Sequence, residues 1–378
     1  MFPLPLPLTL ENVLFLLLAF TVLVQFFYAF YYFLALALFK KHLPFQTPGF
    51  PVTVIVCAHN EYENLLRLIP KLLKQNYPEF ELMLIDDRSK DETGGYMQQI
   101  TQYYPNARLI SIKNTPAGFN PKKYALSLGI KSAKHEHLLF TDADCVPLSE
   151  NWIGEMVKGY KNGAEIVLGY GKYEQLPGFL GYLIKYETLL SAIQYLSFAV
   201  KGKPYMGVGR NLSYTKSCFY RNKGFASHIR ATGGDDDLFV RDAAANSKIN
   251  VVIGQEAQTE SKAKETWSEW WQQKRRHLSA GKKYKLADRF RIGSFILANI
   301  LFYGLSVVLL VMQANLVWLG AIFAGRCLVV YSIYYQAAGN LKERLSVVLM
   351  PVLDLIYYIL YIMLSVSVLM FKKIAWKK

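Results

Sequence analysis

The sequence predicts an α/β fold, with a mainly parallel sheet and crossover helices in the middle of the chain and transmembrane helices at both ends. Long apolar runs lie near the two termini of the 378-residue chain, and hydrophobic residues make up 52% of it. Between those runs, short β-branched stretches alternate with stretches of helical periodicity, which is typical of parallel strands joined by helices. Polar clusters follow three of the predicted strands, where ligands bind in sheets of this kind.

The composition limits the possible partners. A formal charge of +15 is compatible with nucleic-acid binding, but the sequence contains no nucleic-acid-binding motif. Because apolar runs long enough to span a membrane are present, basic residues at a lipid surface explain the charge better. The four cysteines lack the spacing of metal or disulfide pairs, which favours a reducing compartment for the globular part.

The N-terminal apolar run predicts a membrane anchor over residues 1–45. Residues 13–38 form 26 uncharged positions, and at ~1.5 Å per residue a helix of this length exceeds the ~30 Å hydrocarbon layer. The run lacks a basic start and a small-residue cleavage site, so it is not a signal peptide. Lys40 and Lys41 follow at once, which places this end in the cytosol together with the globular domain predicted over residues 46–263.

The globular domain begins with alternating strands and helices. In order, we predict a strand at 52–57, a helix at 61–75, strands at 81–85 and 108–112, a helix at 122–133 and a strand at 138–141. Each polar cluster follows one of these strands, and the clusters are residues 58–61, 86–93 and 142–144. Because the carboxyl ends of parallel strands lie at one edge of a sheet, we expect the clusters to meet there. Helices at 152–161 and 179–199 and strands at 166–173 and 251–253 form the second half of the domain.

A basic, tryptophan-containing segment follows the domain. Residues 264–291 contain nine Lys/Arg and three Asp/Glu, with three interleaved tryptophans. This composition favours an interfacial helix over residues 264–293, and a solvated basic helix is the alternative.

Three apolar runs close the chain and predict C-terminal transmembrane helices over residues 294–378. The runs are residues 294–312, 316–335 and 346–371, with a hairpin turn at 313–315. If all three cross, the C-terminal lysines lie outside, against the positive-inside tendency. A re-entrant or interfacial last run therefore remains open.

Two charged residues, Arg326 and Asp354, lie inside the last two apolar runs. An isolated charge at the centre of a bilayer costs about 2.5–3.5 kcal/mol on insertion scales, so both side chains are expected to face protein or water. We expect them to pair across two helices. Two alternatives are that Arg326 turns towards an anionic lipid, or that both side chains reach the interface.

The strand ending at residue 141 is followed by two carboxylates, Asp142 and Asp144. Alternate side chains of an extended segment share a face, so these carboxylates can point the same way. Two adjacent carboxylates repel unless a cation lies between them, and Mg²⁺ or Mn²⁺ bound there keeps positions open for substrate phosphates. The alternative is a solvated turn after a strand.

Taken together, the motifs resemble family-2 glycosyltransferases over about residues 50–280. The resembling segments are residues 54–61, 86–93 (Asp-Asp-x-Ser-x-Asp-x-Thr), 120–126, 141–144 (Asp-x-Asp), 233–238 and 273–277 (Gln-x-x-Arg). The chain departs from the family pattern at four positions, with Cys57 for proline, Pro121 for glycine, Ser127 for asparagine and His277 for tryptophan.

The resemblance implies a GT-A type, Rossmann-like fold and a UDP- or GDP-sugar donor. The donor-binding positions it implies are Asn60, Glu61, Asp86, Asp87, Lys122, Asp142, Gln273 and Arg276. It implies a divalent cation, Mg or Mn, on Asp142 and Asp144, and it places Asn211 and His277 near the acceptor. The attacking hydroxyl must lose a proton, and Asp236, flanked by Asp235 and Asp237, is the expected general base. Asp235 is the second catalytic candidate, and capping of the next helix is the alternative role for this triplet.

The expected function is metal-dependent, inverting transfer of a sugar to a hydroxyl of a membrane lipid or lipid-linked glycan, as in cell-envelope glycan biosynthesis. The expected location is the inner membrane, with several crossings and a cytosolic catalytic domain. A processive polysaccharide synthase is the first alternative, and a non-catalytic membrane scaffold that keeps the fold is the second.

Overall fold

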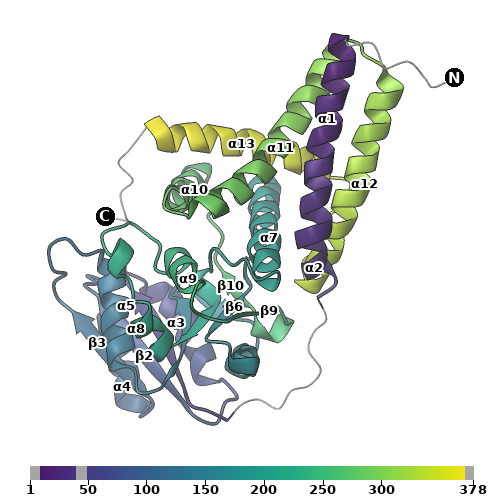
Figure 1. The fold of residues 1–378 in the computed structure, drawn as a ribbon. Coiled ribbons are helices and arrows are strands. Elements are labelled where there is room, and N and C mark those ends of the chain that lie inside the picture. Colours follow the sequence, from purple (N-terminus) through teal and green to yellow (C-terminus); the bar gives the residue numbers. More distant parts are fainter. Residues whose placement is uncertain (1–8, 40–48, 371–378) are drawn as a thin grey trace. The chain divides into compact units, whose positions relative to one another are not determined.

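A computed structural model describes residues 9–39 and 49–370 of the chain (Figure 1). The chain divides into two compact units, and within the described residues a helical unit combines residues 9–39 with Lys285–Met370 while a sheet unit spans residues 49–284. The lysines on which the predicted orientation depends, at 40, 41, 372, 373, 377 and 378, lie outside the described residues.

The sheet unit contains a seven-stranded sheet of order β3-β2-β1-β4-β8-β6-β9. The strands are β1 (Val52–Ala58), β2 (Phe80–Asp87), β3 (Ala107–Ile112), β4 (His137–Asp142), β6 (Ile166–Gly169), β8 (Leu212–Thr215) and β9 (Ile249–Val252). β8 runs antiparallel to both β4 and β6, and the other pairs are parallel. The predicted α/β class with a mainly parallel sheet is therefore confirmed.

Helices cover both faces of this sheet, as the alternation along β1 requires. Val54 and Val56 point into a core with α3 (Tyr62–Leu73), whose buried positions repeat every three or four residues. Ile55 points to the opposite face, towards α5 (Pro121–Ser132). Gly129 of α5 lies so close to this face that a Cβ there would be 2.3 Å from Ile85 Cδ1, so a larger residue would require the Ile85 side chain to move. Two further helices, α4 (Thr93–Tyr103) and α6 (Trp152–Val157), complete the covering layers.

A second, three-stranded sheet lies beside the first and differs from the prediction. The expected strand at 166–173 is split, because β7 (Gly171–Tyr173) leaves the large sheet and pairs with β10 (Thr259–Ser261). β10 also pairs with β5 (Cys145–Pro147), and this register aligns Cys145, Ser261 and Tyr173 in one row. The segment that follows Asp144 is thereby joined to residues far along the chain.

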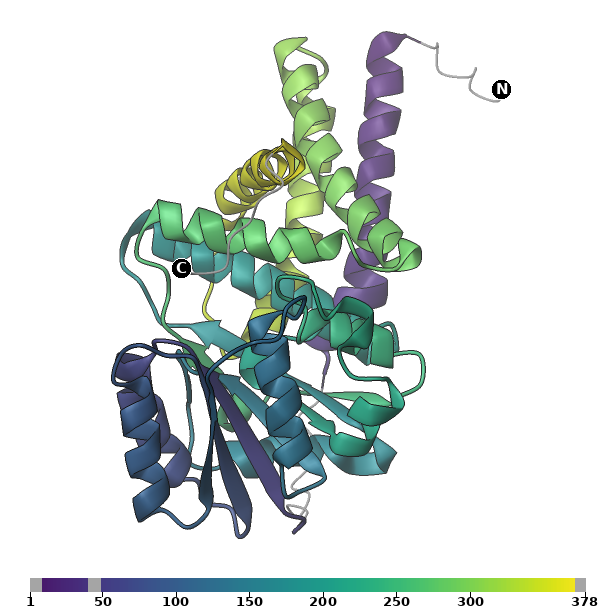
Figure 2. The ribbon, with the colours of Figure 1, turned by 90° about the vertical axis from the view of Figure 1, so that its left-hand side faces the viewer.

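The helical unit contains four helices that are long and apolar enough to cross a membrane. They are the N-terminal helix, made of α1 (Leu10–Phe27), a π-helical segment (Tyr28–Phe33) and α2 (Leu34–Ala37), and then α11 (Leu286–Val311), α12 (Leu316–Asn340) and α13 (Met350–Met370). Asn315 caps α12, so the expected hairpin turn between α11 and α12 is present. Figures 1 and 2 show α13 at a steep angle to the other three helices of this unit, whereas its length and hydropathy are those of a membrane span.

Candidate active site at the carboxyl ends of the central strands

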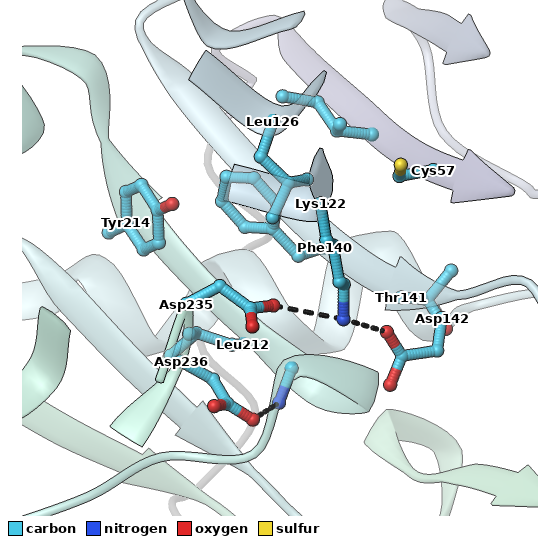
Figure 3. Close-up of a pocket in the computed structure, with 12 residues that line it drawn as sticks. Cys57, Lys122, Leu126, Phe140, Thr141, Asp142, Leu212, Tyr214, Asp235 and Asp236 are labelled. Carbon is cyan, nitrogen blue, oxygen red and sulfur yellow. Dashed lines mark hydrogen bonds and ion pairs between the residues drawn. The ribbon is translucent and has the colours of Figure 1, made fainter. Parts of the chain in front are cut away.

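A pocket opens at the carboxyl ends of β1 and β4 (Figure 3). Its charged lining comes from three separate parts of the chain, namely the first turn of α5, the end of β4 and the turn before α9 (Asp237–Ala243). These parts supply Lys122, Asp142, Asp235 and Asp236. The structure thus brings together four of the residues that the sequence predicted for the site.

Lys122 links the two acidic sides of the pocket. Its Nζ lies 2.8 Å from Asp142 Oδ1 and 2.9 Å from Asp235 Oδ2, as Figure 3 shows. Burial disfavours the ammonium, but the two carboxylates more than offset this, so the pKa of Lys122 lies well above its ordinary value. Burial likewise raises the pKa of Asp235, but Lys122 outweighs it and holds that pKa below the usual value. The pair Lys122–Asp235 is therefore ionised at neutral pH.

Asp142 and Asp144 form the candidate metal site. One ligand atom from each of Asp142, Asp144 and Cys145 lies within 4.8 Å of the other two. Burial and the charge of the neighbouring Asp142 raise the pKa of Asp144. A cation bound between the two carboxylates would reduce their repulsion. Burial also keeps the Cys145 thiol protonated, and its Sγ lies 2.8 Å from Ser261 Oγ. Two carboxylates are hard oxygen ligands, so the donor set fits Mg²⁺ or Mn²⁺.

The acidic triplet enters the site from a turn with two glycines in the left-handed region, Gly233 (φ 75°) and Gly234 (φ 88°). Asp236 accepts hydrogen bonds from the backbone N–H of Gly209 (2.7 Å) and of Asp237 (2.7 Å). It therefore caps α9, which is the alternative role considered from the sequence, and it also lines the pocket. Burial first, and then the charges of Asp235 and Asp237, raise the pKa of Asp236 to about 7.

The predicted donor-binding carboxylates Asp86 and Asp87 point to opposite faces of β2, because successive side chains alternate. Asp87 is buried and pairs with Arg88 (2.8 Å). Asp86 accepts a hydrogen bond from the backbone N–H of Ser89 (3.0 Å), and a Cβ on Gly94 would be 2.8 Å from its Oδ2. The two carboxylates are thus held separately, one on each side of the strand end.

Asn60 and Glu61 tie the end of β1 to the loop after β2. Asn60 adopts a left-handed conformation (φ 54°), and its side-chain oxygen accepts a hydrogen bond from Lys90 N–H (2.8 Å). The backbone N–H of Glu61 donates to Thr93 Oγ1 (2.9 Å). These contacts hold two of the polar clusters side by side, as the parallel strand order led us to expect.

The expected acceptor role of Asn211 does not fit its surroundings. Its side chain is fully buried, donates to the carbonyls of Tyr170 (2.9 Å) and Ala257 (2.8 Å), and accepts from Trp152 Nε1 (3.1 Å). Because these bonds join three elements of the core, Asn211 is a packing residue and is not available to a substrate.

The Gln-x-x-Arg segment lies on α10 (Trp267–Gly281). Gln273 donates to the Tyr173 hydroxyl (3.2 Å), and Lys274 pairs with Glu187 of α7 (Gly178–Val200). Trp270 is buried, whereas Trp267 and His277 are exposed. One face of α10 is therefore packed within the sheet unit, and the interfacial placement of its exposed face stays a prediction. Arg276 occupies the same helix and is half-buried.

Arg210 is a cation of this region that the sequence did not single out. Its guanidinium stacks on the Tyr173 ring at 4.5 Å from the centroid. Its carbonyl accepts hydrogen bonds from Thr141 (3.2 Å) and Thr259 (3.0 Å). Tyr173 and Thr259 come close only through the register of the small sheet, so no local sequence signal could have revealed this contact.

Comparisons with known proteins identify a family for this chain. The model "Glycosyl transferase family 2" matches residues 53–209, and "Glycosyl transferase family group 2" matches residues 137–370, more than half of the chain. A probable glycosyltransferase, YdaM of Bacillus subtilis, is 24% identical over 233 residues, which cover 60% of this chain and 54% of that protein. A poly-β-1,6-N-acetyl-D-glucosamine synthase of Staphylococcus epidermidis is 22% identical over 248 residues, which cover 63% of this chain and 56% of that protein. The chain thus spans about half the length of these curated relatives.

A solved structure shares the fold. The mannosyltransferase PcManGT from Pyrobaculum calidifontis, determined in complex with GDP-Man and Mn²⁺, superposes with a TM-score of 0.60 at 17% identity. The superposition covers 88% of this chain and 99% of that one, so the expected GT-A type fold is confirmed. On the family match over more than half of its length, the chain belongs to glycosyl transferase family group 2, as its motifs predicted.

Proposed function

We propose that this protein transfers a sugar from a UDP- or GDP-sugar to a hydroxyl of a membrane lipid or lipid-linked glycan, with inversion and with a divalent cation. The observation that carries the proposal is the pocket in which Lys122, Asp142 and Asp236 meet at the carboxyl ends of the strands. A nucleotide diphosphate needs cations and an acceptor hydroxyl needs a base, and this pocket supplies groups of both kinds within one cavity.

The donor diphosphate would lie beyond the ends of β1 and β4. Asp142 and Asp144 would hold Mg²⁺ or Mn²⁺, which when bound stabilises the negative charge that develops on the leaving phosphate. Lys122 would contact the same phosphates from the first turn of α5. Gln273 and Arg276 of α10 would close over the diphosphate.

The nucleoside would lie over the loops that follow β1 and β2. Asn60, Glu61, Asp86 and Asp87 belong to these loops and strand ends, and carboxylate and amide oxygens accept hydrogen bonds from a base or ribose; Asp87 would have to exchange its bond with Arg88 for one with the nucleoside. The bonds of Asn60 to Lys90 and of Glu61 to Thr93 join the two loops and hold them in position for this binding.

Asp236 would act as the general base. A carboxylate with a pKa near 7 is a strong enough base to accept a proton from the attacking hydroxyl, yet a substantial fraction is ionised at neutral pH. One displacement assisted by one base inverts the anomeric carbon, because the acceptor attacks from the face opposite the leaving phosphate. Asp235 is paired with Lys122, so it would contribute its negative charge to the site and would not accept the proton.

The acceptor would be membrane-bound. Four helices within residues 9–39 and 49–370 are long and apolar enough to cross a membrane, and His277 is exposed on α10, which comes just before Lys285–Met370 in the sequence. We place the protein in the inner membrane, with the sheet unit in the cytosol.

A processive polysaccharide synthase is the second candidate. The similarity to a poly-β-1,6-N-acetyl-D-glucosamine synthase supports it, whereas His277 in place of tryptophan counts against it. A non-catalytic scaffold would have no need for carboxylates at three strand ends.

Membranes containing the full chain, incubated with a panel of labelled UDP- and GDP-sugars and extracted with organic solvent, would test the proposal. We expect one labelled sugar on a lipid-soluble product. A labelled polymer would favour the synthase, and the absence of released nucleoside diphosphate with every donor would refute the transferase.

A further inference from the structure

Lys123, next to Lys122 on α5, is fully buried, which is unusual for a lysine. Its Nζ donates to the backbone carbonyls of His228 (2.7 Å) and Ala231 (2.9 Å). It forms no ion pair with any carboxylate in residues 9–39 and 49–370. Burial lowers the pKa of Lys123 to about 8, so keeping a charged lysine here opposes folding unless the hydrogen bonds compensate.

The two carbonyls belong to a short turn, residues 228–231. This turn is closed by a hydrogen bond from Ala231 N–H to the His228 carbonyl (2.9 Å). A third bond, from Asn120 N–H to the Ile229 carbonyl (2.9 Å), also comes from the start of α5. The first turn of α5 therefore binds this turn at three carbonyls.

The turn leads directly into the acidic triplet. Between Ala231 and Asp235 lie Thr232 and the glycines Gly233 and Gly234, both with positive φ. Glycine has the widest conformational range of all residues, so this connection does not hold the triplet in place by itself. Contacts before and after the two glycines must therefore hold the acidic triplet in place.

Adjacent lysines meet this need from the two sides. Lys123 holds the residues before the glycines, and Lys122 holds the carboxylate of Asp235 just after them. Because both lysines come from one turn of α5, the triplet is fixed relative to Asp142, which Lys122 also contacts.

We propose that Lys123 is a positioning residue for the general base, since its two hydrogen bonds to the 228–231 turn fix where Asp236 stands relative to the donor side of the pocket. This inference rests on the proposed function for the role of Asp236. The statement that Lys123 holds the 228–231 turn and the glycines after it does not depend on the proposed function.

The test uses the full chain in detergent, with Lys123→Met as an uncharged substitute of similar length and Lys131→Met as the matched control. Lys131 lies on the same helix and is exposed. Three quantities are measured: binding of GDP and of UDP with Mn²⁺, turnover with the active donor, and amide hydrogen exchange of residues 229–236 compared with β4.

For Lys123→Met we expect nucleotide binding like that of the parent, faster exchange in residues 229–236 with unchanged β4, and a kcat lower by about 10² with little change in the donor KM. Lys131→Met should resemble the parent throughout. If Lys123→Met is not recovered folded, Lys123→Gln takes its place, since its shorter, uncharged side chain keeps an amide donor group, and it should show the same pattern to a smaller extent.

Parent-like turnover or parent-like exchange in the lysine variant would overturn the proposal. Loss of nucleotide binding together with turnover would also overturn it, because that pattern indicates a general structural role. If the parent itself transfers no sugar, the proposed function fails, and the exchange measurement still decides whether Lys123 holds the turn.

Discussion

Arg326 and Asp354 form an ion pair of 2.8 Å inside the helical unit, and both side chains are fully buried. The pair joins α12 to α13, as the sequence led us to expect. Arg326 also donates to Gln25 (2.7 Å) and Asn299 (2.8 Å), so the N-terminal helix and α11 take part as well. Two tyrosine hydroxyls complete the network around Asp354, Tyr303 (2.9 Å) and Tyr331 (3.1 Å).

Removal of one partner should destabilise this unit strongly. Arg326→Ala or Asp354→Ala leaves an unpaired buried charge, which typically costs about 3–5 kcal/mol. We expect low yield and early aggregation in detergent size-exclusion chromatography. The exchanged pair Arg326→Asp with Asp354→Arg should recover part of the yield, and Arg289→Ala, an exposed charge on α11, is the control. Single variants that express and elute like the parent would exclude an energetic role for the pair.

The Asp-x-Asp carboxylates should make nucleotide binding depend on a divalent cation. Asp142→Asn and Asp144→Asn are expected to abolish the difference in GDP or UDP affinity between Mn²⁺ and chelator, and to abolish transfer. Isothermal titration measures the affinity, and Glu256→Gln, an exposed carboxylate of the same unit, should behave like the parent. Full transfer by the parent in excess chelator would remove the metal from the mechanism.

Lys122 should compete with a cation for Asp142, because its Nζ already lies 2.8 Å from that carboxylate. Without nucleotide, Lys122→Met is therefore expected to bind Mn²⁺ more tightly than the parent, as followed by electron paramagnetic resonance of free Mn²⁺. The same variant should bind GDP or UDP more weakly than the parent, since a contact between Lys122 and the phosphates is lost. A variant with unchanged Mn²⁺ affinity would show that Asp142 is not a ligand or that the ion pair is weak.

The strands and helices of the first half of the sheet unit could be predicted because their signals are local. Buried parallel strands are continuous apolar runs, and β1, β2 and β4 match those runs within a residue or two. The helix α4 was not predicted, because Gly94, Gly95 and polar residues weaken its periodicity. Burial of Met97 and Ile100 against the sheet stabilises it instead.

The site could be predicted to the extent that it consists of carboxylates in short local motifs, one after a strand and one before a helix. Asp142, Asp235 and Asp236 do meet in one pocket. Arg210 and Lys123 could not be assigned, because their roles depend on partners far along the chain. The assignment of Asn211 to the acceptor failed for the same reason, since its hydrogen bonds reach Trp152 and Ala257.

Asn211→Ala should therefore lower stability rather than acceptor affinity. The change leaves buried polar partners unsatisfied, each at about 1–3 kcal/mol. We expect a clearly lower melting temperature for the sheet unit, with an unchanged acceptor KM at temperatures where the variant is folded. A parent-like melting temperature with a raised acceptor KM would restore the substrate role.

The final prediction concerns the pH dependence of transfer. A base must be unprotonated, so a pKa raised to about 7 means that kcat/KM should rise with pH through that value and level off above it. Asp236→Asn should lower transfer by about 10² or more and abolish this limb, while nucleotide binding is retained. Asp235→Asn removes the negative charge that helps to raise the pKa of Asp236. In this variant the rise of kcat/KM should therefore shift to lower pH. If Asp236→Asn keeps activity and Asp235→Asn loses it, the general base is Asp235, and the ion pair with Lys122 must open before the hydroxyl attacks.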